Sequence, residues 1–163
     1  MKAFNIFIST LIFFISSLAN ANEKIKFSLD WKFEGPSAIF LTSKERGYYK
    51  SSGLDVTIDS GKGSRDAIPK VASGTYPLGF ADINSVIKFL DQNPKAKVKA
   101  IMMVYDRPPF AIIGRKSLGV VKPKDLEGKI LGAPAPDGAY AQWKSFVKAN
   151  NINASKVKIE NVG

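Results

Sequence analysis

The sequence contains polar and aromatic residues that could bind a ligand, but it lacks the two residue types on which most catalysis depends. None of its 163 residues is His or Cys. Imidazole bases, thiolate nucleophiles and the metal sites built from them are therefore excluded, and with them Ser-His-Asp and Cys-His catalysis. The remaining classes are a carboxylate enzyme, a lysine enzyme, or a protein that only binds.

The pair Asp30-Trp31 has suitable chemistry to hold a flat heterocycle. A Trp ring can stack on such a ligand, and the Asp carboxylate can accept hydrogen bonds from ring N–H or amino groups. The pair follows Lys24–Leu29, whose alternating apolar residues predict a strand. The alternative is structural, with Trp31 packed on Pro36 and Asp30 capping a turn, and we favour the binding role.

The loop Gly61-Lys62-Gly63-Ser64 lies between a predicted strand, Leu54–Ile58, and a predicted helix, Ser64–Ala72. Gly63 lets backbone N–H groups approach a ligand, the helix start favours an anion, and the Ser64 hydroxyl adds a donor. The alternative is a tight turn with Ser64 as the helix N-cap. A Walker A loop is excluded because the spacing is wrong and no Lys-Ser/Thr pair ends the loop.

Two further candidates, Asp82 and Asn84, stand at the start of another predicted helix, Ile83–Asp91. This helix directly follows a short predicted strand, Leu78–Ala81. Its start is expected to face the ligand crevice, so either side chain can bind a ligand. A simple N-cap role for Asp82 explains the sequence equally well.

Predicted strands and helices alternate along the chain, which indicates an α/β fold with mostly parallel sheets. In such sheets ligands bind beyond the carboxyl ends of the strands, where the candidates above lie. Apart from the elements already given, apolar periodicity predicts strands at 98–104, 110–114, 130–133 and 157–162, and helices at 38–46 and 139–150.

Residues 1–21 are expected to be a cleavable secretory signal peptide. Lys2 gives a positive start, an apolar run follows from Ala3 to Leu18, and Ala19-Asn20-Ala21 offers a signal peptidase site. The alternative is a membrane anchor, which the well-placed cleavage site disfavours. The mature chain is then expected to begin near Asn22 and to be exported and soluble.

The chain is basic, with 24 Lys plus Arg against 14 Asp plus Glu and a net charge of +10. Nucleic-acid binding is not expected, because the lysines are scattered and an exported protein rarely meets nucleic acid. The charge can still help to attract an anionic ligand.

Several segments in order resemble the opening of periplasmic substrate-binding proteins of ABC importers, of the kind that bind thiamine pyrimidine precursors, aliphatic sulfonates, taurine or nitrate. The similar segments are LDW at 29–31, AIF at 38–40, KERGYYKSSGLDV at 44–56, GKGS at 61–64, VASG at 71–74, GFAD at 79–82 and PKDLEGK at 123–129. The resemblance covers 22–163, and its ordered set of segments is specific.

The resemblance implies a two-lobed fold, the type II-like periplasmic binding fold, whose α/β lobes close on a ligand like a trap. It places lobe one at 22–106 and the start of lobe two at 107–163, with the second lobe incomplete. A unit of about 55 residues is small for an independent core. We therefore expect that lobe two is completed by a partner or that the chain is part of a longer one.

By the same resemblance the chain passes through a hinge near Asp106. Tyr105 lies there and is a candidate ligand contact. Arg107 can pair with an anionic ligand or with Asp106, and we favour the structural ion pair with Asp106.

Lobe two is expected to contribute Asp137 and Tyr140, which follow a predicted strand and can close on the ligand. Trp143 lies one helical turn from Phe146 and is expected in the core instead. No metal site, cofactor or catalytic carboxylate pair is expected, and the segment 125–128 predicts a turn.

The implied function is the solute-binding component of an ABC importer, not an enzyme. At full length it would be a monomer that captures a small polar molecule and delivers it to a permease and ATPase in the inner membrane. Asp30-Trp31 favours a thiamine pyrimidine precursor or similar heterocycle, and the Gly63-Ser64 helix start keeps a sulfonate, taurine or nitrate as the alternative. Two rivals are a sensory domain and a pyrimidine-synthesising enzyme of the same fold; that enzyme uses pyridoxal phosphate and a His, which this sequence lacks.

Overall fold

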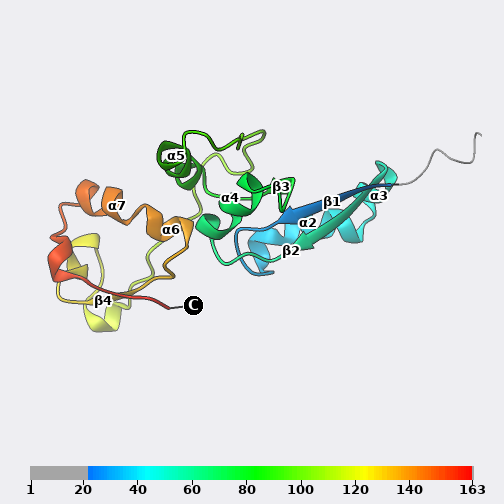
Figure 1. The fold of residues 1–163 in the computed structure, drawn as a ribbon. Helices are drawn as coiled ribbons and strands as arrows, with labels where there is room; N and C mark the ends of the chain where they lie inside the picture. The colour runs from blue at the N-terminus through cyan, green and yellow to red at the C-terminus, as the bar shows by residue number, and fades with distance from the viewer. Residues whose placement is uncertain (1–21, 163) are drawn as a thin grey trace, which may run out of the picture.

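The computed structural model describes residues 22–162, so the expected signal peptide at 1–21 lies outside the described residues. Two separate parallel sheets lie toward opposite ends of the described chain, with helices between them (Figure 1). The predicted α/β class with parallel strands is confirmed. No helix in this part of the chain is long and apolar enough to cross a membrane.

The first sheet contains three strands, all of which the sequence predicts. They are β1 (Glu23–Ser28), β2 (Leu54–Asp59) and the shorter β3 (Leu78–Gly79), in the order β2-β1-β3. All pairs are parallel, and Phe27 of β1 lies opposite Ile58 of β2. Because parallel strands share a direction, their carboxyl ends meet at one edge of the sheet.

Helices cover this sheet and complete its core. A 3-10 turn, η1 (Gly35–Ser37), leads into α2 (Ala38–Glu45), and α3 (Tyr48–Ser51) follows after Gly47, whose φ of 72° is the left-handed conformation that Gly tolerates. The buried core consists of Leu29, Val56 and Ile58, against which Phe27, Phe40, Leu41 and Tyr49 pack.

Two helices follow the second and third strands, as predicted. The helix α4 (Ser64–Ala72) buries Ala67 and Ile68, and α5 (Ile83–Gln92) begins after Asp82. The chain thus repeats a strand-loop-helix unit, and each loop lies at the carboxyl edge of the sheet.

The two strands predicted at 98–104 and 110–114 are wrong. Both segments lack regular secondary structure and strand pairing, and their large apolar side chains are mostly exposed. A strand is defined by its hydrogen bonds to a neighbour, and apolar composition alone does not provide one. No strand among residues 22–162 lies against either segment.

The second sheet has two parallel strands, β4 (Ile130–Gly132) and β5 (Lys158–Glu160), close to the predicted positions. Its core is formed by Leu126, Ile152 and Val157, with Trp143 and Phe146 packed beside them. The rings of Trp143 and Phe146 stack at a centroid separation of 6.0 Å, so the core role expected for Trp143 is confirmed.

The helix predicted at 139–150 is split in two. The pieces are α6 (Gly138–Ala141) and α7 (Trp143–Ala149), and Gln142 between them has φ −91° and ψ 0°, away from α-helical values. The Gln142 side chain donates a hydrogen bond to Asp82, 60 residues earlier in the chain. The break therefore coincides with a contact between the two halves of the molecule.

Short 3-10 turns complete this part of the fold: η2 (Lys116–Leu118), η3 (Pro123–Leu126) and η4 (Ala154–Lys156). The turn predicted at 125–128 is confirmed. The Glu127 carboxylate accepts from the backbone N–H of Asn153 at 2.7 Å and pairs with Lys124 Nζ at 2.8 Å. These contacts, with the backbone hydrogen bond dominant, hold the pKa of Glu127 below its ordinary value.

The substitution Leu29→Ala tests the core of the first sheet. Leu29 is 1% exposed, so the change should lower the free energy of unfolding by about 2–5 kcal/mol. Ile39→Ala on α2 is the control, since Ile39 is half exposed and should lose under about 1 kcal/mol. Urea denaturation followed by circular dichroism measures both, and equal losses would contradict this assignment of the core.

Candidate functional site

Three loops meet at the carboxyl edge of the first sheet. Asp30 and Trp31 follow β1, the segment 61–64 follows β2, and Asp82 follows β3. The first two loops are tied together, because the N–H of Gly61 donates to the Trp31 carbonyl at 3.0 Å. The edge thus carries candidates from every strand of the sheet, as the parallel topology predicts.

Asp30 has the most perturbed environment of these residues. Its pKa is raised from 3.8 to about 6, mainly because burial disfavours the charged carboxylate. The negative charges of Asp137 and then Asp82 raise it further. Three predicted site residues, from three loops and both halves of the chain, are therefore close enough for two of them to act on the charge of the third.

Asp82 is the helix N-cap that the sequence allows. One carboxylate oxygen accepts from the N–H of Ser85 at 2.7 Å, and the other accepts from Gln142 Nε2 at 3.2 Å and Asn84 Nδ2 at 3.4 Å. Asp82 is half-buried and Asn84 is exposed. Asp82 thus fixes the start of α5, and its charge acts on Asp30.

The start of α4 is in contact with the second half of the chain. Gly63, not Ser64, occupies the N-cap, with a φ of 135°. The N–H of Arg65 donates to the Pro136 carbonyl at 3.2 Å, and the Arg65 side chain donates to the Ala135 carbonyl at 3.1 Å. The sequence suggests that the backbone N–H groups at this helix start could bind an anion. In the structure the N–H of Arg65 is instead bonded to a protein carbonyl.

Glycine is required at both sides of this contact. A Cβ at Gly63 would overlap the Pro136 carbonyl, and a Cβ at Gly138 would lie 2.8 Å from Asp82 Cβ and 3.0 Å from Ser64 Oγ. Ser64 is buried, and its hydroxyl oxygen accepts from the Asp82 N–H at 2.9 Å. The two halves of the chain therefore meet backbone to backbone.

Asp137 and Tyr140 come from the second half. Asp137 caps α6, accepting from the N–H of Ala139 at 3.1 Å, and its charge acts on Asp30. Tyr140 is half-buried on the same helix. Asp137 is thus placed beside the crevice of the first sheet by the contact at Pro136.

Trp31 and Tyr105 lie at the margins of this edge. Trp31 is half-buried, with Lys32 Nζ 5.6 Å from its ring centroid. The Tyr105 hydroxyl donates to the Pro36 carbonyl at 3.2 Å, and its ring lies edge-on to Phe80 at 6.0 Å. Tyr105 therefore holds its segment against the first sheet.

The ion pair expected between Arg107 and Asp106 is not formed in the described part of the chain. Both side chains are exposed, and neither has an ion-pair partner within 4.0 Å among residues 22–162. Two exposed neighbours gain little from pairing in water, because each would lose side-chain entropy. The expectation of a hinge ion pair is therefore wrong.

Sequence reasoning did not identify Gln142 and Arg65 as contacts of the site. Gln142 was expected inside a continuous helix, and Arg65 was expected to be an ordinary helix residue. Both act only through residues more than 50 positions away, so no local pattern could reveal them.

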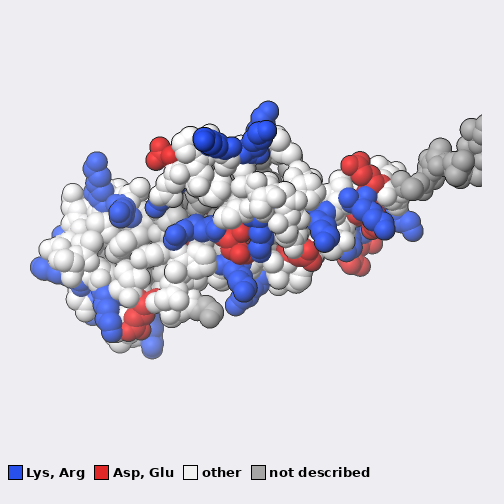
Figure 2. All heavy atoms as spheres, viewed as in Figure 1, with Lys and Arg blue, Asp and Glu red and all other residues white. Residues whose placement is uncertain are grey.

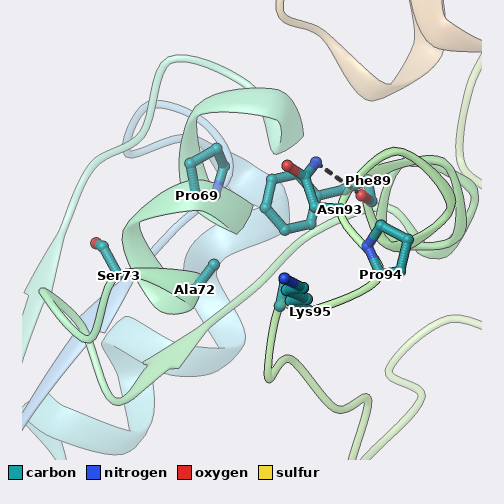
Figure 3. Close-up of a pocket in the computed structure, with 8 residues that line it drawn as sticks. Pro69, Ala72, Ser73, Phe89, Asn93, Pro94 and Lys95 are labelled. Carbon is teal, nitrogen blue, oxygen red and sulfur yellow. Dashed lines mark hydrogen bonds between the residues drawn. The ribbon is translucent and has the colours of Figure 1, made fainter.

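A surface groove lies away from this edge, between the C-terminal ends of α4 and α5 (Figure 3). It has a volume of about 660 Å³ and is lined chiefly by Pro69, Ala72, Phe89 and Pro94, with Lys95 at its side. None of the predicted site residues lines it. The groove and the crevice are separate features.

The carboxyl edge of the first sheet is rich in hydrogen-bond acceptors. Asp30, Asp82 and Asp137 supply carboxylates, and residues 22–162 contain no cluster of three or more His, Cys, Asp or Glu that could hold a metal ion. Lys and Arg are spread over the visible face of the molecule and do not form one patch (Figure 2). The local field therefore favours N–H donors or a cation over an anion.

Comparison with known proteins gives a consistent family relation. Residues 36–163 match the family model described as NMT1/THI5 like. The chain is 23% identical over 128 residues to a riboflavin-binding protein of Chloroflexus aurantiacus, covering 77% of this chain and 36% of that protein. It is 26% identical over 171 aligned positions to a formylaminopyrimidine-binding protein of Halalkalibacterium halodurans, covering 100% of this chain and 51% of that protein. The chain thus spans about half or less of these relatives.

The raised pKa of Asp30 predicts a pH-dependent stability. Between pH 3.8 and about 6 the folded state binds a proton on Asp30 that the unfolded state releases, so stability falls as pH rises through this window. Asp30→Asn removes this contribution, and the free energy of unfolding should then depend less on pH there. Urea denaturation across the window measures the slope, and an unchanged slope would contradict the assignment.

The substitution Gly63→Ala tests the contact between the halves. It should destabilise the protein by about 1–3 kcal/mol, because a Cβ meets the Pro136 carbonyl and the φ is unfavourable. Gly74→Ala is the control, since Gly74 also has a positive φ, +77°, but open space around it. Thermal unfolding should show a clearly larger loss for Gly63→Ala. Equal losses would mean that only backbone strain matters.

Proposed function

The chain belongs to the NMT1/THI5-like family, and from this premise we propose that it is the ligand-capturing part of an exported solute-binding protein. The relatives named above are both binding proteins by name. Since the chain spans about half or less of their length, this function belongs to the whole protein. The proposed mechanism is capture of a small molecule at the carboxyl edge of the first sheet, closure, and delivery to a membrane permease.

The observation that carries the proposal is the group of carboxylates beside Trp31. Asp30, Asp82 and Asp137 offer acceptors from two halves of the chain, and Trp31 follows Asp30 directly. A flat heterocycle with several N–H donors matches both features, since its ring can stack and its donors can be satisfied. We therefore propose a thiamine pyrimidine precursor or a similar nitrogen heterocycle as ligand.

The names of the relatives support this ligand class. Formylaminopyrimidine and riboflavin both contain a flat nitrogen heterocycle. A sulfonate, taurine or nitrate remains a second candidate, favoured by the glycine loop at the start of α4 and the net charge of +10. It ranks lower because Arg65 N–H is bonded to Pro136 and three carboxylates would repel an anion.

We propose no catalysis. The sequence has no His, which the pyridoxal phosphate enzymes of this fold are expected to need, and the relatives are named for binding. A visible absorption band from bound pyridoxal phosphate would instead favour the enzyme. Export through residues 1–21, a periplasmic location, a monomeric state and a permease–ATPase partner are parts of the same proposal.

Calorimetric titration of the native protein with an aminopyrimidine and with taurine tests the ligand class. The aminopyrimidine should bind. Asp30→Asn and Trp31→Ala should each weaken binding about 10–100-fold, the first because a carboxylate that accepts hydrogen bonds from the ligand is lost and the second because the stacking ring is lost. Asp55→Asn, an exposed carboxylate on β2, is the matched control and should bind normally. Binding of taurine alone, or equal binding by Asp30→Asn, would overturn the proposal.

A further inference from the structure

Asp30 is a half-buried carboxylate of the proposed site, and no cation of the described chain is paired with it. Among residues 22–162 no Lys or Arg nitrogen lies within 4.0 Å of its oxygens. Two nearby cations are engaged elsewhere: Lys32 Nζ lies 5.6 Å from the Trp31 ring centroid, and the Arg65 side chain donates to the Ala135 carbonyl. A charged Asp30 therefore lacks a compensating side chain.

The two other carboxylates of the site are committed to helix starts. Asp82 accepts from the N–H of Ser85 at 2.7 Å, and Asp137 accepts from the N–H of Ala139 at 3.1 Å. These donors hold both side chains in place, and the negative charges of both act on Asp30. Asp30, which caps no helix, is thus the one of the three best placed to bind the edge of a ligand.

Polar and charged groups on the neighbouring elements β2 and α4 bond to one another. The Asp59 carboxylate, at the end of β2, accepts from the Tyr76 hydroxyl at 2.9 Å. Asp66 on α4 pairs with Lys70 at 2.6 Å and also accepts from the N–H of Lys62, whose side chain is exposed. Among residues 22–162, these elements therefore bring no cation into contact with the site.

A proton is the compensation that remains. The pKa of Asp30 is raised to about 6, first by burial and then by the charges of Asp137 and Asp82. The backbone N–H groups of Asp30 and Trp31 favour the charged form, but they offset the burial only in part. Protonation of Asp30 thus removes a charge that its surroundings disfavour.

The edge of the proposed ligand also calls for a proton. In an aminopyrimidine whose amino group adjoins a ring nitrogen, an N–H donor stands beside a lone pair that accepts. An ionised carboxylate offers acceptors only, so one oxygen would meet the amino group while the other opposes the ring nitrogen. One added proton, held by the carboxyl group or by the ring nitrogen, converts this opposition into a second hydrogen bond and makes the pair bidentate.

We propose that Asp30 binds a neutral nitrogen heterocycle through one proton taken up from solvent, so that ligand capture is coupled to protonation. The inference rests on the function proposed above and adds the ligand edge that Asp30 recognises, a donor beside an acceptor. A permanently cationic ligand with two adjacent donors would match the ionised carboxylate without this proton. The proton comes from water or buffer, and no bond between heavy atoms forms or breaks.

Calorimetric titration of the native protein with such an aminopyrimidine tests the coupling. At about pH 7.5, in phosphate and in Tris, the observed enthalpies should differ by the amount that uptake of about one proton per ligand requires. The complex holds a proton that the separate site and ligand release, so affinity should fall as pH rises, by up to about tenfold per pH unit. Below the pKa of about 6 Asp30 already carries its proton, so the uptake should decline at about pH 5.

Two carboxylate variants assign the proton to Asp30. Asp30→Asn offers an amide donor and acceptor without any proton to take up, so its weaker binding should show no uptake and no dependence on pH. It binds more weakly because a neutral amide lacks the charge-assisted hydrogen bond. Asp55→Asn, an exposed carboxylate on β2, should keep both the uptake and the pH dependence of the unsubstituted protein.

The outcomes separate this inference from the function on which it rests. Binding of the aminopyrimidine with equal enthalpies in the two buffers, or uptake that persists in Asp30→Asn, would overturn proton coupling at Asp30 and leave the binding function intact. Absence of binding at every pH would overturn both. If Asp30→Asn does not fold, the comparison of buffers with the unsubstituted protein still decides whether a proton is taken up.

Discussion

The backbone contact at Pro136 is the interaction on which the site depends. The Pro136 carbonyl accepts from the N–H of Arg65, and Gly63 leaves room for that approach. The contact brings Asp137 close enough to raise the pKa of Asp30. Without it, the contact between the halves would be left to the side-chain hydrogen bonds of Arg65 and Gln142, and Asp137 would be less firmly placed near Asp30. Because the contact uses main-chain atoms and glycines, little side-chain bulk separates the halves.

The electrostatics of the site oppose those of the whole chain. The net charge is +10, yet the crevice gathers three carboxylates. Exposed lysines spread over the surface are screened by salt within about 10 Å, whereas half-buried charges interact through a medium of lower dielectric. The local carboxylates therefore decide which ligand groups are favourable, while the net charge acts mainly on the approach of solutes. The net charge favours an anion, whereas the three carboxylates favour the N–H donors of the proposed heterocycle.

Much of the first sheet could be predicted because its signals are local. Ser64–Ala72 follows a glycine loop and Asp82 is a good N-cap, so both helices start where expected. Asp30, Asp82 and Asp137 were found by one rule, that ligands lie beyond the ends of parallel strands. The contact of Gln142 was missed, and the segment 98–104 was wrongly assigned to a strand, because neither is decided by local signals. The position of Gln142 depends on a residue distant in sequence, and a strand needs a hydrogen-bonded neighbour that 98–104 lacks among residues 22–162; periodicity reports neither.

The binding edge and the open edge of the first sheet are different places. The ligand candidates lie in loops at the carboxyl ends of β1, β2 and β3, whereas the open edge is the side of β3 that has no pairing strand among residues 22–162. Loops set the chemistry of a site, but their positions are only as rigid as the sheet that holds them. In this structure a three-stranded sheet presents Asp30 and Trp31 at its carboxyl edge. The chemistry of the proposed site therefore comes from these loops, and its rigidity comes from the packing of the sheet that carries them.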